Sequence, residues 1–320
     1  MITRVPAGST GVVHAALLYR GEGAYLDTVL PFVAEGLAKS ESVLIALPQK
    51  SLALVRQALG DAADEVTMAD ITEIGRNPGR ILGWQAAFAA ERADRPVRIT
   101  TEILWPGRTV EEYPACVQHE ALFNMAFAGR DMTALCLYDA EALDTIAAAD
   151  VGCTHPVLWQ SGSMQISPDY QPVAVLDRYN QPLPNSATAV HYTVRTAGDL
   201  GPARSFATRY AQWLGLSADG VTNLLLIMTE LATNSLQHAG SACRLAFWQH
   251  NGNLVCQASD QGRLDDPLAG RRPPPTDDAT AGRGLYLVNT IADLVRSHTS
   301  VNGTTIQAYL RLDSSKDPIT

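Results

Sequence analysis

The chain has 320 residues, of which 46% are hydrophobic and 18% charged, and this ordinary globular composition predicts two folded domains rather than a disordered chain. Its net charge of −9 argues against a broad surface for nucleic acid or anionic membranes, because such surfaces are rich in Lys and Arg. The expected partner is therefore a protein or a small molecule.

Cysteine usage and hydropathy indicate a soluble, cytoplasmic protein. The five cysteines show neither CxxC spacing nor a Cys/His ligand pattern, so the sequence predicts no zinc site and suits a reducing compartment. No stretch reaches the length of about 18 apolar residues that a membrane-spanning helix needs. The opening residues MITRVPAGSTGVVHAALLYR also lack a signal-peptide cleavage pattern.

Residues 1–165 are predicted to form an α/β domain. Strand-like and helix-like segments alternate in the order VVHAALLY, LDTVLPFVAEGLAKS, SVLIALP and SLALVRQALG. VRITTEILW and TALCLYD are predicted as further strands, with the helix EEYPACVQHEALFNMAF between them. This alternation predicts βαβ units in a mainly parallel sheet with flanking helices. The expected buried face of the last helix consists of Val117, Leu122, Phe123, Met125 and Phe127.

Residues 166–188 are predicted to be an extended linker between two domains. Pro168, Pro172, Pro182 and Pro184 lie among mixed apolar and polar residues that keep no helical period. Prolines at this density favour an extended backbone.

Residues 189–320 are predicted to form an α+β domain with helices on one face of a mainly antiparallel sheet. A strand, AVHYTVRT, precedes two helices, which Asp199 and Ser217 are suited to cap. The strands CRLAFWQH and NLVCQASD flank Asn251-Gly252, a strong hairpin signal because both residues tolerate positive φ. A helix at about 285–295 and the strand TTIQAYLRL follow.

The second of these helices carries three polar residues in one stripe. Glu230, Asn234 and His238 are four residues apart, so their side chains face the same side of the helix. Asn234 can offer an amide oxygen to Mg²⁺, and Glu230 can accept a proton from an attacking hydroxyl. Taken alone, the stripe is better explained as solvated positions on an amphipathic helix. His238 is expected to bind the last carbonyls of its own helix.

Two glycine-containing segments are suited to a nucleotide. In ASDQGR, Asp260 can accept a hydrogen bond from an adenine amine, and Gly262 lets the base lie close to the backbone. In DATAGRGLYLVNTIAD, Gly282, Arg283 and Gly284 precede a helix whose free N–H groups and dipole can hold phosphate oxygens. Each segment alone is more often an ordinary turn.

A final segment, NGTTIQAYL, places Thr304 and Thr305 at the start of a strand, which β-propensity alone explains. The order of the four segments is more informative than any one of them. They follow one another as helix, strand end, loop into helix, and strand.

This ordered set resembles the GHKL, or Bergerat-type, ATPase domain of histidine kinases and gyrase, and most closely the anti-sigma-factor serine kinases of the RsbW type. ELATNSLQHA resembles the N box of that family, SDQG and GRGLYLV its two glycine boxes, and GTT its last motif, over about residues 189–312. The resemblance implies binding of ATP and Mg²⁺. The implied roles are Glu230 as catalytic base, Asn234 as the metal ligand, Asp260 as the adenine reader, and Gly262, Gly282, Arg283, Gly284 and Thr305 as further nucleotide contacts.

The segment RLDDPLAGRRPPPTDDATA lies between the two glycine boxes and would be the lid over the nucleotide. Its three consecutive prolines forbid a continuous helix. Leu264 stands where the family often has a further Gly or Pro, so the sequence departs from the pattern at the base of this lid.

The first domain resembles the MEDS sensory domain of methanogen and methylotroph regulators, from about His14 to Trp159. The resemblance rests on HAALLYRGEGAYLDTVLPFVAEGLAKSESVLIAL, RITTEILWP, LFNMAFAGRDMTALCLYD and THPVLW. It implies a small ligand, and the polar residues suited to contact it are His14, Tyr19, Glu102, Trp105, Tyr138 and His155. Packing explains each of these residues equally well.

The domain order is similar to that of RsbA-type regulatory proteins. This resemblance implies a ligand-responsive ATP-binding regulator that acts as an anti-sigma factor, or as a serine/threonine kinase of an anti-sigma antagonist. A homodimer is compatible with the same resemblance. One alternative is a sensor histidine kinase, with His119 in a helical segment as its acceptor. Another is a non-catalytic, nucleotide- or ligand-gated binding module.

Overall fold

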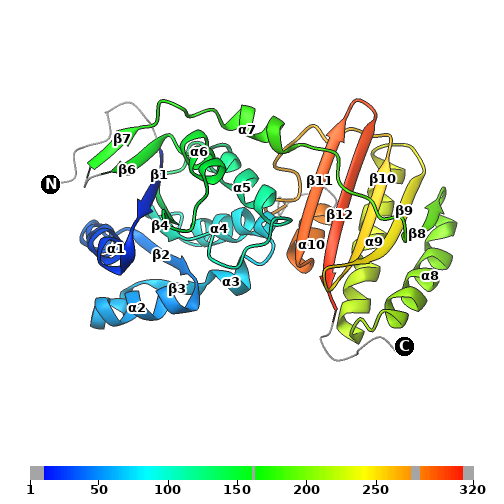
Figure 1. Cartoon of the computed structure of the whole chain (residues 1–320), viewed down its shortest axis with the longest axis horizontal. Coiled ribbons are helices and arrows are strands. Elements are labelled where there is room, and N and C mark those ends of the chain that lie inside the picture. Colours follow the sequence, from blue (N-terminus) through cyan, green and yellow to red (C-terminus); the bar gives the residue numbers. More distant parts are fainter. Residues whose placement is uncertain (1–10, 161–162, 275–281, 313–320) are drawn as a thin grey trace. The chain divides into compact units, whose positions relative to one another are not determined.

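A computed structural model describes residues 11–160, 163–274 and 282–312 (Figure 1). The chain divides into two compact units, Met1–Tyr179 and Asn180–Thr320, and each is described by itself.

The first unit is built on a seven-stranded sheet with the strand order β3-β2-β4-β5-β1-β6-β7. Every neighbouring pair is parallel except β6 and β7, which are antiparallel. The strands are β1 (Val12–Tyr19), β2 (Ser42–Leu47), β3 (Thr67–Asp70), β4 (Val97–Thr101), β5 (Met132–Asp139), β6 (Val157–Gln160) and β7 (Ser163–Ile166). The predicted mainly parallel sheet is confirmed.

Helices cover both faces of this sheet. They are α1 (Gly21–Ala38), α2 (Gln49–Leu59), α3 (Ile71–Ile74), α4 (Ile81–Ala90), α5 (Tyr113–Ala126), α6 (Thr145–Thr154) and α7 (Pro172–Tyr179), with 3₁₀ turns at Gly60–Glu65 and Pro78–Arg80. Alternate residues of the central strands point to opposite faces. Leu17 and Leu137 pack with Phe32 of α1, whereas Cys136 packs with Val151 of α6. Burial on both faces explains why these strands are continuous apolar runs.

Helix α5 buries most of the predicted face, with one exception. Val117, Leu122, Phe123 and Phe127 are buried, but Met125 is 45% exposed, so the prediction for Met125 is wrong. Met125 lies two residues, or about 200°, beyond Phe123, which places it on the opposite side of the helix.

Part of the predicted linker is helical. Val175 of α7 is fully buried against Val117 and Ala121 of α5. Pro172 opens α7 at a position where a missing N–H removes no intrahelical bond. The prolines of this segment therefore mark the start of a helix as well as extended backbone.

The second unit contains a five-stranded antiparallel sheet with the order β11-β12-β10-β9-β8. The strands are β8 (Val190–Val194), β9 (Cys243–His250), β10 (Asn253–Asp260), β11 (Leu294–Ser300) and β12 (Gly303–Arg311). Three helices, α8 (Leu200–Trp213), α9 (Ala218–Gln237) and α10 (Arg283–Ile291), cover one face, and a 3₁₀ turn lies at Ala197–Asp199 (Figure 1). The predicted α+β arrangement is confirmed.

Local signals position two of these elements as predicted. Ser217 caps α9, since its Oγ accepts a hydrogen bond from the Gly220 N–H at 3.1 Å. Asn251 and Gly252 have φ of 43° and 73° in the tight turn between β9 and β10. Asp199 behaves differently, because its carboxylate forms a capping box with Thr196 around the 3₁₀ turn rather than capping α8.

Strand β11 was not predicted. The helix expected to reach about residue 295 ends at Ile291, and Ala292 has an extended backbone with ψ of 148°. Leu294 then begins a strand that pairs with β12. Among the described residues, no helix combines the length and the apolar character needed to cross a lipid bilayer.

Candidate nucleotide-binding site

A cavity of about 590 Å³ opens in the second unit between α9, the end of β10, the segment that follows it and the start of α10. Its size lies within the usual range for small-molecule sites, about 300–1,000 Å³. Seven of the eight predicted site residues line it: Glu230, Asn234, Asp260, Gly262, Gly282, Arg283 and Gly284. Segments far apart in the sequence therefore contribute to one cavity.

Helix α9 and the start of α10 meet at Gly284. A Cβ atom placed on Gly284 would lie 2.6 Å from Glu230 Oε2 and 3.3 Å from Asn234 Oδ1. The carboxylate and the amide therefore face the backbone of the second glycine segment directly. A side chain at position 284 would fill the space in front of both groups.

The first turn of α10 lines this region of the cavity. Gly282 precedes the helix with φ of 73°, a left-handed conformation that suits glycine, and among the described residues no side chain caps the helix there. The first N–H groups of a helix lack intrahelical partners, and its dipole favours anions. Gly282, Arg283 and Gly284 all line the cavity, so this helix start is suited to phosphate oxygens.

Asp260, at the end of β10, is held in place by two neighbours. Its Oδ1 accepts a hydrogen bond from the Gly262 N–H at 2.8 Å, and its Oδ2 accepts one from the Ser235 hydroxyl at 2.6 Å. A carboxylate has about four acceptor positions, so further ones remain for a ligand amine. Ser235 lies on α9 and is buried, and the sequence reading did not single it out.

Close packing explains two glycines around Asp260. A Cβ on Gly262 would lie 2.5 Å from the Cβ of Ala239. A Cβ on Gly303 would lie 2.0 Å from the carbonyl oxygen of Asp260, and φ at Gly303 is 131°. The glycine of the GTT motif therefore lets β12 pass close to the end of β10.

Thr305 lies away from the cavity, and Thr304 lines it instead. Neighbouring residues of a strand point to opposite faces, so only one of the two can face the cavity. Thr304 donates a hydrogen bond to the Gly262 carbonyl at 2.8 Å, whereas the Thr305 hydroxyl lies 3.1 Å from that of Ser259. Thr304, one residue before the predicted Thr305, is thus the threonine that lines the cavity.

His238 ends α9, and its backbone N–H donates to the Asn234 carbonyl at 2.8 Å. Its side chain is exposed and lines the cavity. Leu264 also lines the cavity, and its N–H donates to Thr299 Oγ1 at 3.1 Å. The predicted lid continues into residues 275–281, which lie outside the described part of the chain.

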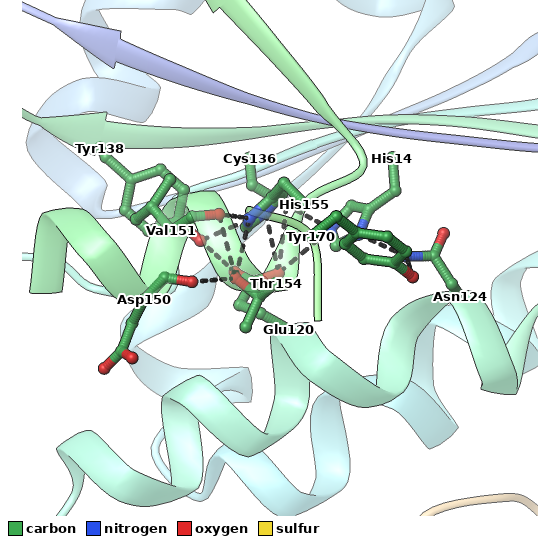
Figure 2. A network of polar contacts seen from close by, with 10 residues as sticks. All are labelled: His14, Glu120, Asn124, Cys136, Tyr138, Asp150, Val151, Thr154, His155 and Tyr170. Atoms are coloured by element: carbon green, nitrogen blue, oxygen red, sulfur yellow. Dashed lines mark hydrogen bonds and ion pairs between the residues drawn. The ribbon is translucent and has the colours of Figure 1, made fainter. Parts of the chain in front are cut away.

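The residues suggested as ligand contacts in the first unit fall into separate groups. Tyr19 donates to Glu102 Oε1 at 3.0 Å, at the carboxyl ends of β1 and β4. The guanidinium of Arg108 covers the Trp105 ring at 3.5 Å from the ring centroid. The remaining three, His14, Tyr138 and His155, lie in one buried cluster with Glu120 and Cys136 (Figure 2).

Comparison with known protein families identifies both units. Residues 13–156 match the MEDS family, the methanogen/methylotroph DcmR sensory domain. Residues 193–310 match the histidine kinase-like ATPase domain. The chain therefore consists of a MEDS sensory domain followed by a histidine kinase-like ATPase domain, which confirms the predicted domain order and implies ATP binding.

Among solved structures, that of the RsbU and RsbW domains of a Mycobacterium tuberculosis protein is similar to part of the chain, with 16% identity and a TM-score of 0.31. The match covers 42% of this chain and 35% of that one, so the chain spans little more than a third of its length. No curated protein matches the chain.

Proposed function

We propose that the chain is a ligand-responsive regulator of transcription that uses Mg²⁺ and ATP in its second domain. It would act as an anti-sigma factor, or as a serine/threonine kinase of an anti-sigma antagonist, under the control of the MEDS domain. The observation that carries this proposal is the convergence of Glu230 and Asn234 on Gly284 at the start of α10.

The residues present fit a magnesium nucleotide. The cavity of about 590 Å³ presents an amide oxygen, a carboxylate and a helix start within one space, and Gly284 leaves room where a Cβ would meet Glu230. A nucleotide bound there would supply the γ-phosphoryl group. Asn234 would bind the metal, the α10 N–H groups would hold phosphate oxygens, and Asp260 would accept a hydrogen bond from the adenine amine.

Glu230 would act on the phosphoryl acceptor. Phosphoryl transfer depends mainly on positioning, on neutralisation of charge and on a residue that orients the attacking hydroxyl. Glu230 is half-buried on the cavity wall beside Asn234, so it is placed to accept the proton of a serine or threonine hydroxyl from a partner protein.

The test is binding and transfer by the full chain with γ-labelled ATP and Mg²⁺. We expect Asn234→Ala to weaken Mg²⁺-dependent ATP binding. Glu230→Gln should keep ATP binding and lose transfer to a partner captured from the native cytoplasm. Thr305→Ala, which changes a residue off the cavity, is the matched control and should behave as wild type. A folded wild-type chain that binds no nucleotide would contradict the proposal.

One observation favours a non-catalytic alternative. Leu264 lines the cavity where the family often has a Gly or Pro, so the base of the lid differs from the common pattern. In that case, ATP would only set the shape of a partner-binding surface. Sustained transfer that Glu230→Gln abolishes, with ATP binding unchanged, excludes this alternative.

The histidine kinase alternative is disfavoured by the position of His119. This side chain is fully buried within α5, in the MEDS domain, whereas a phosphoryl acceptor has to reach the nucleotide. Acid-labile phosphate on His119 after incubation with ATP would restore that alternative.

A further inference from the structure

The MEDS domain contains a buried cluster of four groups that are common metal ligands. His14 comes from β1, Glu120 from α5, Cys136 from β5, and His155 follows α6 (Figure 2). Their exposed fractions are 0%, 2%, 1% and 0%. Polar side chains rarely lie this deep unless they are paired or bind a metal, so the cluster calls for a physical explanation.

Four of the six distances within the cluster fit the edges of a tetrahedron. His14 Nε2 lies 3.2 Å from Glu120 Oε2 and 3.3 Å from Cys136 Sγ. Glu120 Oε2 lies 3.4 Å from Cys136 Sγ and 3.4 Å from His155 Nε2. All four ligand atoms lie within 4.8 Å of one another. A zinc ion about 2.0–2.3 Å from each ligand holds the ligand atoms about 3.3–3.7 Å apart.

The surroundings of His155 leave its Nε2 free to act as a ligand. Its Nδ1 lies 3.0 Å from the Val151 carbonyl and 3.0 Å from the Thr154 hydroxyl, whose own proton goes to the Asp150 carbonyl at 2.8 Å. Both neighbours of Nδ1 are therefore acceptors, so Nδ1 carries the proton. The lone pair of Nε2 then faces Glu120 Oε2, another acceptor, and a positive charge between the two would satisfy both.

The other ligands also have supporting partners. Tyr138 donates its hydroxyl to Glu120 Oε1 at 2.7 Å, which leaves Oε2 directed at the cluster. The Asn124 amide lies 3.3 Å from His14 Nδ1 and 3.0 Å from the Tyr170 hydroxyl. Asn124 Nδ2 is the atom at this position. A 180° rotation of the amide exchanges its nitrogen and oxygen, lets Oδ1 accept the proton of His14 Nδ1, and leaves His14 Nε2 available to a metal ion. Such outer partners are typical of metal-binding histidines and carboxylates.

Charge balance also favours a bound divalent cation. A carboxylate and a thiolate carry two negative charges, the two imidazoles are neutral, and a divalent cation makes the site neutral overall. The site is buried from solvent, with the Phe123 ring stacked on His14 at 4.3 Å between centroids and Val151 packed with Cys136. An uncompensated charge in such an environment is costly.

We propose that His14 Nε2, Glu120 Oε2, Cys136 Sγ and His155 Nε2 together bind one divalent transition-metal ion of the zinc class. Imidazole and thiolate ligands favour such an ion over Mg²⁺ or Ca²⁺, which prefer oxygen. Four protein ligands and full burial describe a closed site, in which the ion links β1, β5, α5 and the end of α6.

The test begins with the wild-type chain, purified without a histidine tag. We expect about one equivalent of zinc per chain, and zinc-edge X-ray absorption should show one sulfur and three nitrogen or oxygen ligands. After removal of the metal by a chelator, Co²⁺ should give the d–d absorption of a tetrahedral site and a thiolate-to-cobalt charge-transfer band. A folded chain that binds neither ion, or a site without sulfur, would overturn the proposal and leave a hydrogen-bonded network of the same residues.

Two cysteine variants separate the ligand from ordinary packing. Cys136→Ser should lose the charge-transfer band and bind Co²⁺ at least about tenfold more weakly, because a hydroxyl is a poorer ligand than a thiolate. Cys116→Ser changes another fully buried cysteine of the same domain, outside the cluster, and should keep both properties. Equal binding by the two variants would exclude Cys136 as a ligand. The X-ray absorption result needs no variant, so it decides the matter even if Cys136→Ser does not fold.

Discussion

Ser235 lies one residue after Asn234 on α9 and donates its hydroxyl to Asp260 at 2.6 Å. This bond, together with the one from the Gly262 N–H, fixes the direction in which the carboxylate meets a ligand. The same hydroxyl lies 3.1 Å from the Leu231 carbonyl of its own helix, so its single proton is shared between the two acceptors, with Asp260 the nearer. The orientation of Asp260 therefore depends on a residue that belongs to none of the predicted contacts.

We expect Ser235→Ala to weaken ATP binding about five- to tenfold, because loss of one such hydrogen bond costs about 1 kcal/mol. Binding of inorganic triphosphate should stay unchanged, since Asp260 is expected to contact the base only. Calorimetric titration of both ligands measures the difference. Ser205→Ala, at an exposed serine of α8, is the control. Equal weakening of ATP and triphosphate would show that Ser235 does not act through the adenine end of the cavity.

Glu102 makes the stability of the MEDS domain depend on pH. Burial raises the pKa of its carboxyl from 4.5 to about 7, against the opposing effect of the Tyr19 hydrogen bond. The folded state therefore holds the proton more tightly than the unfolded state. Its stabilising contribution is present below pH 4.5 and is lost as the pH rises to about 7.

Glu102→Gln should therefore become more stable relative to wild type as the pH rises from 4.5 to 7, by about 3 kcal/mol at most, with no further change above pH 7. The amide keeps an oxygen for the Tyr19 hydroxyl. Urea unfolding of the MEDS domain at pH 5, 6 and 8 measures the effect. Glu141→Gln, at an exposed carboxylate, should show no such trend. A stability difference independent of pH would contradict the raised pKa.

At the scale of elements, helix α10 contributes both to the cavity and to the hydrophobic core of the second domain. Its first residues line the cavity, while Val288 is fully buried in the core beneath the sheet. Two glycines at its start serve different purposes: Gly282 provides a left-handed turn, and Gly284 provides space beside Glu230.

We expect Gly284→Ala to lower phosphoryl transfer about a hundredfold, because its Cβ would displace the Glu230 carboxylate by a fraction of an ångström or more. The melting temperature should stay the same or rise, since alanine is a better helix former by about 1 kcal/mol. Gly282→Ala should lower stability and keep activity. The substitution costs about 1–2 kcal/mol at positive φ, but its Cβ would meet no atom of the described residues within 4 Å. Transfer assays and thermal melts distinguish the two. If both variants lost activity and stability to the same extent, the separate roles of Gly282 in the turn and Gly284 beside Glu230 would be contradicted.

Local patterns predicted most elements because local forces determine them. The Asn251-Gly252 turn defines β9 and β10, and the side chain of Ser217 marks the start of α9. Strand β11 escaped prediction because the apolar spacing of α10 continues through Val295, and only tertiary pairing with β12 ends the helix at Ile291. Thr305 and Thr304 could not be separated for a similar reason, since the strand register decides which one faces the cavity.

At the scale of the whole molecule, the buried metal-ligand cluster shows what a linear reading misses. The sequence predicted no zinc site because its cysteines lack short ligand spacing. The parallel pairing of β1 with β5 places His14 and Cys136 on one sheet face, although 122 residues separate them, and α5 and the end of α6 supply Glu120 and His155 above it. Such a cluster can be recognised only once the fold shows which distant residues lie together.

The two domains should respond to separate ligands. Each has its own hydrophobic core, so each is expected to unfold in its own transition. ATP with Mg²⁺ at about 100 times its dissociation constant should stabilise the ATPase transition by about 2.7 kcal/mol. Zinc should raise only the transition of the MEDS domain, and a chelator should lower it.

Scanning calorimetry of the full chain with each ligand alone measures these shifts. Asn234→Ala should abolish the shift caused by ATP and leave the shift caused by zinc intact, whereas Cys136→Ser should do the reverse. A single transition that moves with either ligand would contradict independent unfolding. It would mean that the two cores unfold as one cooperative unit. Control of the ATPase domain by the MEDS domain needs only a coupling free energy of about 1–3 kcal/mol between their sites, which is compatible with two separate transitions.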